Sequence, residues 1–393
     1  MKPVQHLLPA LVCLALLAGT TQAATVPVAP ASEVAATPDA TQWHQLPTEA
    51  YKGKQDDIFF VDRDLGFYVN GAGKIFRTVD GGDSWRGVFT KPGTYFRAIG
   101  MVDAQHGFAG NIGTDYFPGV TDETPLYETR DGGDHWSSVR GLPGAQVKGI
   151  CAIDILQVKF IDAGVLSTRT IIHAAGRVGG PAYLLRSLDG GKTWANIDLN
   201  ADVAMIVDVK FFDEMNGIVF AGSSADVEHS HAVIVATRDG GKSWRKVYES
   251  TRPFELTWKG SFPSRDVGYA TVQNYDPDAA NVRRHVVKTI DGGNTWFELP
   301  LVDDHAVNEF GVGFASTERG WVGTSKGGFE TLDGGASWHA VALGRYVNKI
   351  RILPGAGPLT AYAIGADVYR LSTRAAPAIA PSASGGSVDV RKP

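Results

Sequence analysis

The sequence predicts an all-β fold: a seven-bladed β-propeller of four-stranded blades, closed by the N-terminal strand. Three observations support this prediction. One six-residue phrase recurs along the chain, each recurrence falls within a set of four short apolar segments, and the last set lacks a strand that the N-terminus can supply. Repetition of this kind is typical of propellers and other repeat architectures.

The recurring phrase is Asp-Gly-Gly-x-x-Trp, which occurs six times. Neighbouring copies are 42 to 58 residues apart, and together they hold six of the nine Trp residues. Their first residues are Asp80, Asp131, Asp189, Asp239, Asp291 and Asp333. Because each copy marks the same position of one repeat, the phrase organises the fold.

Each repeat contains four short segments with strand-like composition, separated by turn residues. In the first repeat these are residues 58–61, 66–69, 75–78 and 85–88. Four strands in a period of about fifty residues are typical of a propeller blade.

A seventh, incomplete repeat follows the sixth phrase. Residues 350–353, 361–364 and 368–373 supply three strands, but no further Asp-Gly-Gly-x-x-Trp follows them. Residues 41–47 resemble the segment around Trp338. We therefore expect the N-terminal strand to complete the seventh blade and close the ring without leaving an exposed sheet edge.

Composition narrows the class of function. The chain has 393 residues, is 44% hydrophobic and carries a formal charge of −5. A large core is therefore available, and no basic stripe offsets nucleic-acid phosphates. We expect a monomer without a nucleic-acid partner.

The N-terminus has the features of an export signal. Lys2 gives a positive start, residues 7–17 are apolar, and residues 21–23 offer a small-residue cleavage site. Cleavage would remove Cys13 and leave Cys151 as the only cysteine, so we expect no internal disulfide. The predicted organisation is a signal peptide (1–23, cleaved after Ala23), a linker (24–40), the propeller (41–374) and a low-complexity tail (375–393). The protein is expected to be periplasmic or secreted.

The chemistry of the repeated phrase is structural. Asp can accept hydrogen bonds from the backbone of the turn that it begins, and the glycines permit positive φ. Trp supplies apolar area for packing between blades. We interpret the six Asp side chains as turn-stabilising rather than catalytic or calcium-binding, because a residue repeated around a ring does not mark a single site.

The extended pattern Ser/Thr-x-Asp-Gly-Gly-x-Ser/Thr-Trp is the Asp-box of BNR-repeat proteins, here in its Asp-Gly-Gly form. With the seven-blade count over residues 41–374, the chain resembles the photosystem II stability/assembly factor-like propellers. This resemblance implies a WD40/YVTN-like fold and a non-catalytic factor of photosynthesis that docks onto a membrane-protein intermediate. The same box also occurs in sialidases, xyloglucan-degrading hydrolases and sortilin-type receptors, so a glycan-active function stays open.

Alternation along the innermost strands predicts which side chains face the central channel. One set of alternate residues in these strands is almost wholly apolar and includes Ile58, Ile99 and Ile350. We assign the side chains of this parity to packing between blades. The opposite parity is assigned to the channel, where its charged members are Asp57, Asp208, Lys210, Lys259, Lys349 and Arg351. One reading is that these charges simply pair within a hydrated tunnel.

The other reading is a binding site at the upper mouth, where the inner strands begin. The longest predicted loops, residues 111–125, 222–231 and 273–284, open on this face. Long loops on a rigid scaffold often carry binding function. Arg97, Lys148 and Trp258 begin inner strands there, and Arg with aromatic neighbours is typical of protein-interaction sites. We expect Arg97, Lys148 and Lys259 to form one patch.

Other candidate motifs carry less weight. Residues 226–231 contain Asp, Glu and His at close spacing, but a polar loop explains them equally well, so no metal and no cofactor is predicted. A glycosidase would need two suitably placed carboxylates, and Lys side chains near Asp57 and Asp208 would oppose the raised pKa of a general acid.

The leading hypothesis is an exported, non-catalytic scaffold that binds a membrane or exported protein at its upper mouth. In this hypothesis Arg97, Lys148, Lys259 and Arg351 attract acidic groups, and Trp258 gives apolar contact. The alternative is a secreted glycan-active hydrolase or lectin that uses the same mouth, with Asp57 and Asp208 as its carboxylates. A third possibility is a purely structural envelope protein.

Overall fold

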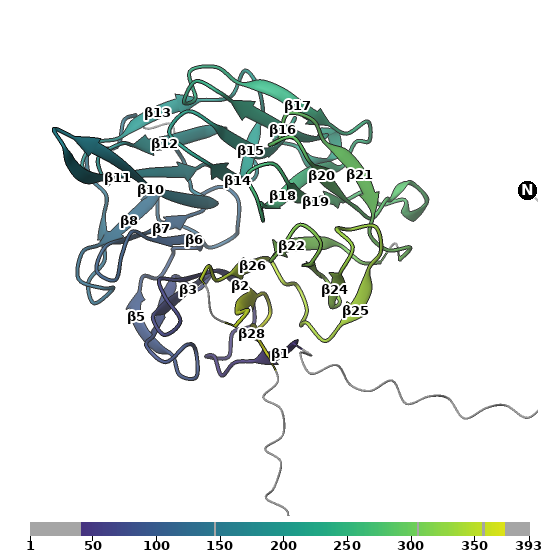
Figure 1. Cartoon of the computed structure of the whole chain (residues 1–393), viewed down its shortest axis with the longest axis horizontal. Helices are drawn as coiled ribbons and strands as arrows, with labels where there is room; N and C mark the ends of the chain where they lie inside the picture. The colour runs from purple at the N-terminus through teal and green to yellow at the C-terminus, as the bar shows by residue number, and fades with distance from the viewer. Residues whose placement is uncertain (1–40, 145–146, 305, 356–357, 374–393) are drawn as a thin grey trace, which may run out of the picture. The chain divides into compact units, whose positions relative to one another are not determined.

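The computed structural model describes residues 41–373, except 145–146, 305 and 356–357. The predicted signal peptide, linker and C-terminal tail lie outside the described residues. Within the described part, seven antiparallel four-stranded sheets are arranged as blades around a ring (Figure 1). The predicted seven-bladed, all-β propeller is confirmed.

The first three blades are formed by consecutive strands. Blade 1 contains β2 (Gln55–Phe60), β3 (Gly66–Asn70), β4 (Lys74–Thr78) and β5 (Arg86–Thr90). Blade 2 contains β6 (Phe96–Met101), β7 (Gly107–Asn111), β8 (Leu126–Thr129) and β9 (Ser137–Ser138). Blade 3 contains β10 (Ala152–Asp162), β11 (Val165–Ala175), β12 (Tyr183–Ser187) and β13 (Ala195–Asp198).

The next three blades follow the same order. Blade 4 contains β14 (Met205–Phe211), β15 (Gly217–Gly222), β16 (Ala232–Thr237) and β17 (Arg245–Glu249). Blade 5 contains β18 (Glu255–Ser261), β19 (Gly268–Asn274), β20 (His285–Thr289) and β21 (Phe297–Pro300). Blade 6 contains β22 (Glu309–Phe314), β23 (Gly320–Thr324), β24 (Gly328–Thr331) and β25 (His339–Val341). Short 3-10 turns, Val227–His229 and Ala279–Asn281, lie in the loops of blades 4 and 5.

Blade 7 joins the two ends of the described chain. It contains β26 (Lys349–Ile352), β27 (Ala361–Ile364), β28 (Val368–Thr373) and, as its outermost strand, β1 (Thr41–Gln45). β1 pairs antiparallel with β28, with Trp43 opposite Leu371. Trp43 packs edge-on against Trp321 of blade 6, with ring centroids 5.8 Å apart. The inner strand of blade 7 contacts that of blade 1, so the ring closes as the sequence predicts.

The Asp-Gly-Gly turns connect the third and fourth strands of blades 1 to 6, and we call the side on which they lie the lower face. In blade 4, Asp239 Oδ1 accepts hydrogen bonds from the backbone N–H groups of Lys242 and Ser243. Thr237 donates its hydroxyl to the same carboxylate at 2.8 Å. The two glycines of this turn, Gly240 and Gly241, have positive φ values of 74° and 84°, which L residues adopt only with strain. These bonds are local, as expected for a turn-stabilising residue.

Apolar clusters between neighbouring blades form the core. Ile58, Ile99 and Ile350, assigned to this packing from the alternation, are all buried. Trp194 of blade 3 contacts Phe108 of blade 2 edge-on, with ring centroids 5.7 Å apart. Trp296 of blade 5 contacts Phe220 of blade 4 in the same way. The repeated Trp therefore joins successive blades and gives the inner strands a fixed frame.

Candidate functional site

The upper ends of five inner strands are irregular. The inner strands of blades 1, 2, 4, 5 and 6 each carry a β-bulge, where one strand has an extra residue relative to its partner. The bulged positions include Asp56, Arg97 and Trp258. A bulge interrupts the alternation of side chains and changes their direction. Strict alternation would point the Arg97 side chain in the same direction as Ile99, which packs between blades. The bulge at Arg97 interrupts the alternation, so Arg97 need not share that direction.

Trp258 is the centre of a cluster that we call the upper-mouth cluster: Lys54, Asp56, Arg97, Trp258, Lys259 and Asn348. Three cationic side chains lie around the indole, with Arg97 at 5.1 Å, Lys54 at 5.6 Å and Lys259 at 5.9 Å from the ring centroid. Cations at this distance are attracted by the negative face of the ring. Trp258 Nε1 donates a hydrogen bond of 3.0 Å to Asn348 Oδ1, which fixes the ring.

Asp56 supplies negative charge to the upper-mouth cluster. Its Oδ1 lies 2.6 Å from Arg97 Nη1 and 3.7 Å from Lys54 Nζ, while Oδ2 is buried with no hydrogen-bond partner among the described residues. Burial alone would lower the pKa of Arg97. The negative charge of Asp56 opposes this effect of burial, and the pKa of Arg97 is raised above its ordinary value. Burial and the nearby Arg97 lower the pKa of Lys54 to about 7. Lys54 therefore titrates near neutral pH.

Below the cluster, ion pairs cross the channel in an alternating chain. Lys259 Nζ lies 3.9 Å from Asp208, and Lys349 Nζ lies 3.8 Å from Asp208 and 3.6 Å from Asp57. Arg351 then pairs with Asp57 at 3.1 Å. Burial lowers the pKa of Lys259 to about 8. These predicted channel residues therefore do meet in the channel, where they pair with one another.

Asp57 and Asp208 lack the arrangement of a glycosidase pair. Lys349 lies between them, and each also accepts a backbone hydrogen bond from the next blade: Asp57 from Ile99 and Asp208 from Gly260. Burial favours neutral Asp57, but Lys349 and Arg351 outweigh it and hold its pKa below the ordinary value. Asp57, held ionised in this way, cannot serve as the protonated acid of glycoside hydrolysis.

Three half-exposed tyrosines lie near the cluster. Tyr116, Tyr275 and Tyr346 are 40%, 41% and 47% exposed. Tyr346 contacts Phe310, which contacts Trp258, each edge-on with centroids 6.1 Å apart. Burial raises the pKa of both Tyr116 and Tyr275, and Arg97 opposes that rise. We call these three side chains the tyrosine rim.

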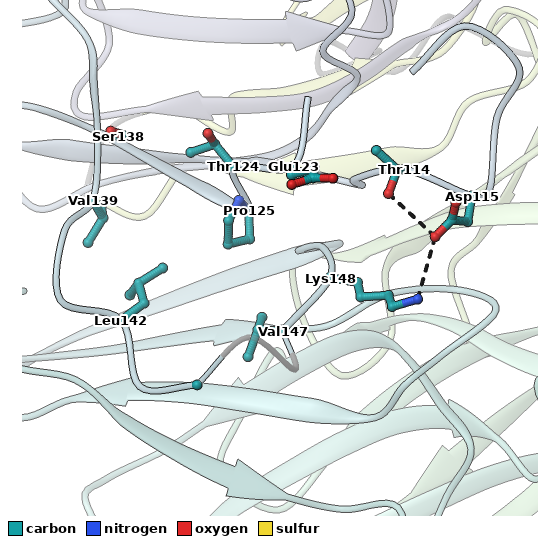
Figure 2. Close-up of a pocket in the computed structure, with 11 residues that line it drawn as sticks. Thr114, Asp115, Glu123, Thr124, Pro125, Ser138, Val139, Leu142, Val147 and Lys148 are labelled. Carbon is teal, nitrogen blue, oxygen red and sulfur yellow. Dashed lines mark hydrogen bonds and ion pairs between the residues drawn. The ribbon is translucent and has the colours of Figure 1, made fainter. Parts of the chain in front are cut away.

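Lys148 is placed apart from the other predicted cations. It lines a separate pocket of about 600 Å³ beside blades 2 and 3, and its Nζ lies 3.4 Å from Asp115 (Figure 2). Its side chain is 51% exposed, whereas those of Arg97 and Lys259 are 3% exposed. No hydrogen bond, ion pair or ring contact of the described residues joins Lys148 to Arg97 or Lys259. The structure brings Arg97, Lys259 and Trp258 together but does not join Lys148 to them.

Lys210 and Arg351 lie away from the upper mouth. Lys210 pairs with Asp154 of blade 3 at 2.9 Å, and its side chain is 39% exposed. Arg351 lines a pocket with Phe59 and Asp62, where the inner strand of blade 1 ends toward the lower face. Arg351 therefore lies away from the upper mouth, where we expected it to attract a partner.

Lys54 and Asp56 were missed by the sequence reasoning. Lys54 precedes the first residue of β2, so it falls outside the alternation that was used to assign the channel. Asp56 sits at a bulge, which composition does not reveal. The Lys-x-Asp-Asp order at residues 54–57 was the available signal, because adjacent charges within an otherwise apolar inner strand need nearby partners.

Two kinds of feature are absent from the described residues. No group of three or more His, Cys, Asp or Glu side chains there is placed to hold a metal ion. Across the same residues, no helix has both the length and the apolar character required to cross a membrane.

Comparison with known proteins identifies the fold. No protein-family model and no curated protein sequence matches the chain. The solved structure of YCF48 bound to D1 peptide aligns with a TM-score of 0.58 at 17% identity, over 86% of this chain and 98% of that chain. The WD40 β-propeller domain of Doa1 aligns with a TM-score of 0.56 at 11% identity, over 86% and 98% of the two chains.

An ancestral GH74 enzyme also aligns, with a TM-score of 0.56 at 14% identity. The alignment covers 84% of this chain but only 46% of the enzyme. Identities this low establish the architecture and not the activity. The chain has the β-propeller fold found in YCF48, as the resemblance in its sequence implied.

Proposed function

We propose that this protein is an exported, non-catalytic propeller that binds a segment of a membrane or exported protein at its upper mouth. The observation that carries the proposal is the upper-mouth cluster beneath the tyrosine rim. Clustered Arg, Trp and Tyr side chains are typical of protein-interaction hot spots. The bound D1 peptide of the structurally similar YCF48 is consistent with a peptide-binding propeller.

The exposure of each side chain indicates which residues of the mouth would contact a partner. Arg97 and Lys259 are almost fully buried, so they hold Trp258 and set a positive potential rather than meet a partner directly. Lys54 has a side chain that is 22% exposed, and the tyrosines are more exposed still. A partner would therefore contact the tyrosine rim first, and an acidic group on it would approach Lys54.

The charge balance of the mouth favours an acidic partner. The upper-mouth cluster contains three cations (Lys54, Arg97 and Lys259) and one carboxylate (Asp56), and Lys259 also reaches Asp208 in the channel below. Asp208 is shared with Lys349, so when Lys54 and Lys259 are protonated the cluster carries more positive than negative charge. An acidic group from a partner would supply part of the missing negative charge.

Affinity capture from the envelope fraction of the native organism tests this proposal. We compare the wild type with Tyr116→Ser/Tyr346→Ser, which changes exposed side chains only. Val79→Ser/Leu332→Ser is the matched control, because those aliphatic residues are 64% and 60% exposed on the lower face. A protein captured by the wild type and the control, but lost in the tyrosine variant, supports the proposal. Equal capture by all three forms contradicts it.

A lectin is the second candidate, since tyrosine side chains can also stack on sugar rings. A broad glycan panel with thermal stabilisation as the readout separates the two proposals. Stabilisation by one glycan that disappears in Tyr116→Ser/Tyr346→Ser would favour a lectin. Stabilisation by none would leave the protein partner as the better account.

A further inference from the structure

The inner hairpin of blade 3 is much longer than its counterparts. β10 and β11 pair over eleven residues each, from Ala152 opposite Ala175 to Asp162 opposite Val165. In the other six blades, the inner strand has four to seven residues. In Figure 1 this hairpin lies at the left of the ring. It is reversed at Ala163 and Gly164, whose φ values of 46° and 83° fit a tight hairpin turn.

The outer half of this hairpin extends beyond its own blade. β12 pairs with β11 only between Ile172 and Ala175, so residues 165–171 pair with β10 alone. The Asp-Gly-Gly turn of blade 3 is joined to the hairpin by a hydrogen bond from Gly190 N–H to the carbonyl of Thr170. At about 3.3 Å per residue, the five residues from 165 to 169 reach roughly 15 Å past that turn, on the lower face.

The tip of the hairpin is aliphatic and exposed. Ile161, Val165 and Leu166 are 76%, 65% and 69% exposed, the three highest values among the large hydrophobic residues of the described chain. Ile161 lies directly opposite Leu166, so both project from one face of the hairpin. Val165, Phe160 and the exposed Asp162, which lies directly opposite Val165, project from the other face, since neighbouring strand residues alternate. One face of the tip is therefore apolar, and the other is apolar apart from Asp162.

Basic side chains lie just behind this tip. Lys159, opposite Thr168, is exposed on the same face as Ile161 and Leu166. Arg169 lies on the other face, 5.2 Å from the Phe160 ring, and pairs with Glu214 of blade 4. Asp162 is the only acidic residue between them. An apolar end followed by cations matches the apolar interior and phosphate headgroups of a lipid layer.

The size and shape of the tip disfavour a protein partner. A stable protein interface takes about 20–30 residues from each side, and the part of the hairpin beyond the blade has about ten. A protein partner would also cover one face, whereas here exposed aliphatic side chains project from both faces. We propose that the tip of the β10–β11 hairpin, residues 160–166, inserts shallowly into the surface of a phospholipid bilayer. This inference does not depend on the function proposed for the upper mouth.

The geometry has a consequence for orientation. The hairpin extends from the lower face, and the upper-mouth cluster lies at the other ends of the inner strands. A propeller held at a bilayer by this tip would present its upper mouth to the aqueous phase. The mouth would then meet chain segments that extend away from the membrane.

Flotation with lipid vesicles tests the proposal on the full mature chain. The vesicles consist of phosphatidylcholine with a minority of phosphatidylglycerol. We compare the wild type with Ile161→Ser/Leu166→Ser, and with Ile290→Ser/Leu332→Ser as the matched control, since these residues are 61% and 60% exposed at Asp-Gly-Gly turns of the same face. Thermal melting of all three forms verifies that the folds are equally stable.

The proposal predicts that wild type and control float with the vesicles, and that the hairpin variant binds at least about tenfold less, as expected for the loss of two large apolar side chains. Lys159→Glu should weaken binding and make it insensitive to phosphatidylglycerol. Wild-type protein that does not float overturns the proposal, as does equal loss in the control. A concentration-dependent dimer that the hairpin variant abolishes would assign the tip to a second copy instead, and would also overturn it.

Discussion

The guanidinium group of Arg97 lies 5.1 Å from the ring centroid of Trp258, although the two residues belong to blades 2 and 5. Both are at bulges of inner strands, and both side chains are almost fully buried. Arg97 is held by Asp56 of blade 1 and Trp258 by Asn348, next to β26 of blade 7. Four blades thus meet at one contact at the top of the channel. The contact therefore joins distant blades at the mouth.

The first prediction concerns the buried pair of Arg97 and Asp56. Arg97→Met removes the closer of the two cations beside the fully buried Asp56 carboxylate and leaves only Lys54, 3.7 Å away, which should lower the free energy of unfolding by about 3–5 kcal/mol. Arg97→Met/Asp56→Asn should recover part of that loss, because the buried carboxylate is removed together with its closest cation. Urea unfolding measures both. Arg86→Met is the control: its pair with Asp134 at 2.9 Å is exposed, so the expected change is below about 1 kcal/mol. Equal losses for Arg97→Met and Arg86→Met would contradict this account.

The second prediction concerns the pH dependence of stability. The pKa of Lys54 is lowered by burial from 10.5 to about 7, so the unfolded chain binds more protons than the folded chain between these values. Stability from this group should therefore rise with pH above about 7. Lys259, with its pKa lowered to about 8, acts in the same direction.

Lys54→Met should be more stable than the wild type near pH 7, and this advantage should shrink toward about pH 9.5. Urea unfolding at several pH values measures the difference. Lys192→Met, at an exposed turn, is the control and should leave the pH profile of the wild type unchanged. A Lys54→Met profile parallel to that of the wild type would show that Lys54 is not perturbed.

The third prediction tests closure of the ring. Trp43 is 6% exposed and joins β1 to the core through Trp321, so Trp43→Ala should lower the free energy of unfolding by about 3–5 kcal/mol. Its neighbour His44 is exposed on the same strand, and His44→Ala should change little. Deletion of residues 41–48 should lower the melting temperature sharply. An unchanged melting temperature after that deletion would mean that β1 does not hold the ring together.

The fourth prediction concerns the Asp-Gly-Gly turns. Hydrogen bonds from Ser243 and Thr237 lower the pKa of Asp239 from 3.8 to about 2. A lowered carboxyl pKa contributes stability above about pH 4 that is lost as pH falls toward 2. Asp239→Ala should therefore lower the melting temperature at pH 7 and differ less from the wild type near pH 2. A decrease of equal size at both values would exclude the ionised carboxylate as the cause.

The fold was predictable from the sequence because its signals are local and repeated. Each Asp-Gly-Gly turn carries its own hydrogen-bond acceptor, positive-φ glycines and interblade Trp, so every copy reports the same position in a blade. The closing strand was predictable for the same reason, since residues 41–47 repeat the context of Trp338. The extended β10–β11 hairpin was missed, although residues 153–172 are strand-like with an Ala-Gly turn between them.

The site was only partly predictable. The ion pairs of Asp57, Asp208, Lys259 and Lys349 follow from simple alternation, and the structure places them together. Arg97 and Trp258 were chosen because they begin inner strands, but their contact depends on two bulges that shift the alternation. Lys148 begins a segment of the same kind, yet it turns outward to Asp115. Bulges and loop paths arise from packing between blades, which one strand's sequence does not determine.

Site-specific photo-crosslinking in the envelope of the native organism tests the central claim, that the upper mouth binds a protein partner, most directly. A photo-reactive amino acid replaces Tyr346 in one form, Tyr116 in a second and Leu332 of the lower face in a third; the three native side chains are 47%, 40% and 60% exposed. We predict that one and the same protein crosslinks from Tyr346 and from Tyr116, and not from Leu332. Crosslinking of that protein from Leu332 alone, or no crosslink from either tyrosine position, would contradict the claim.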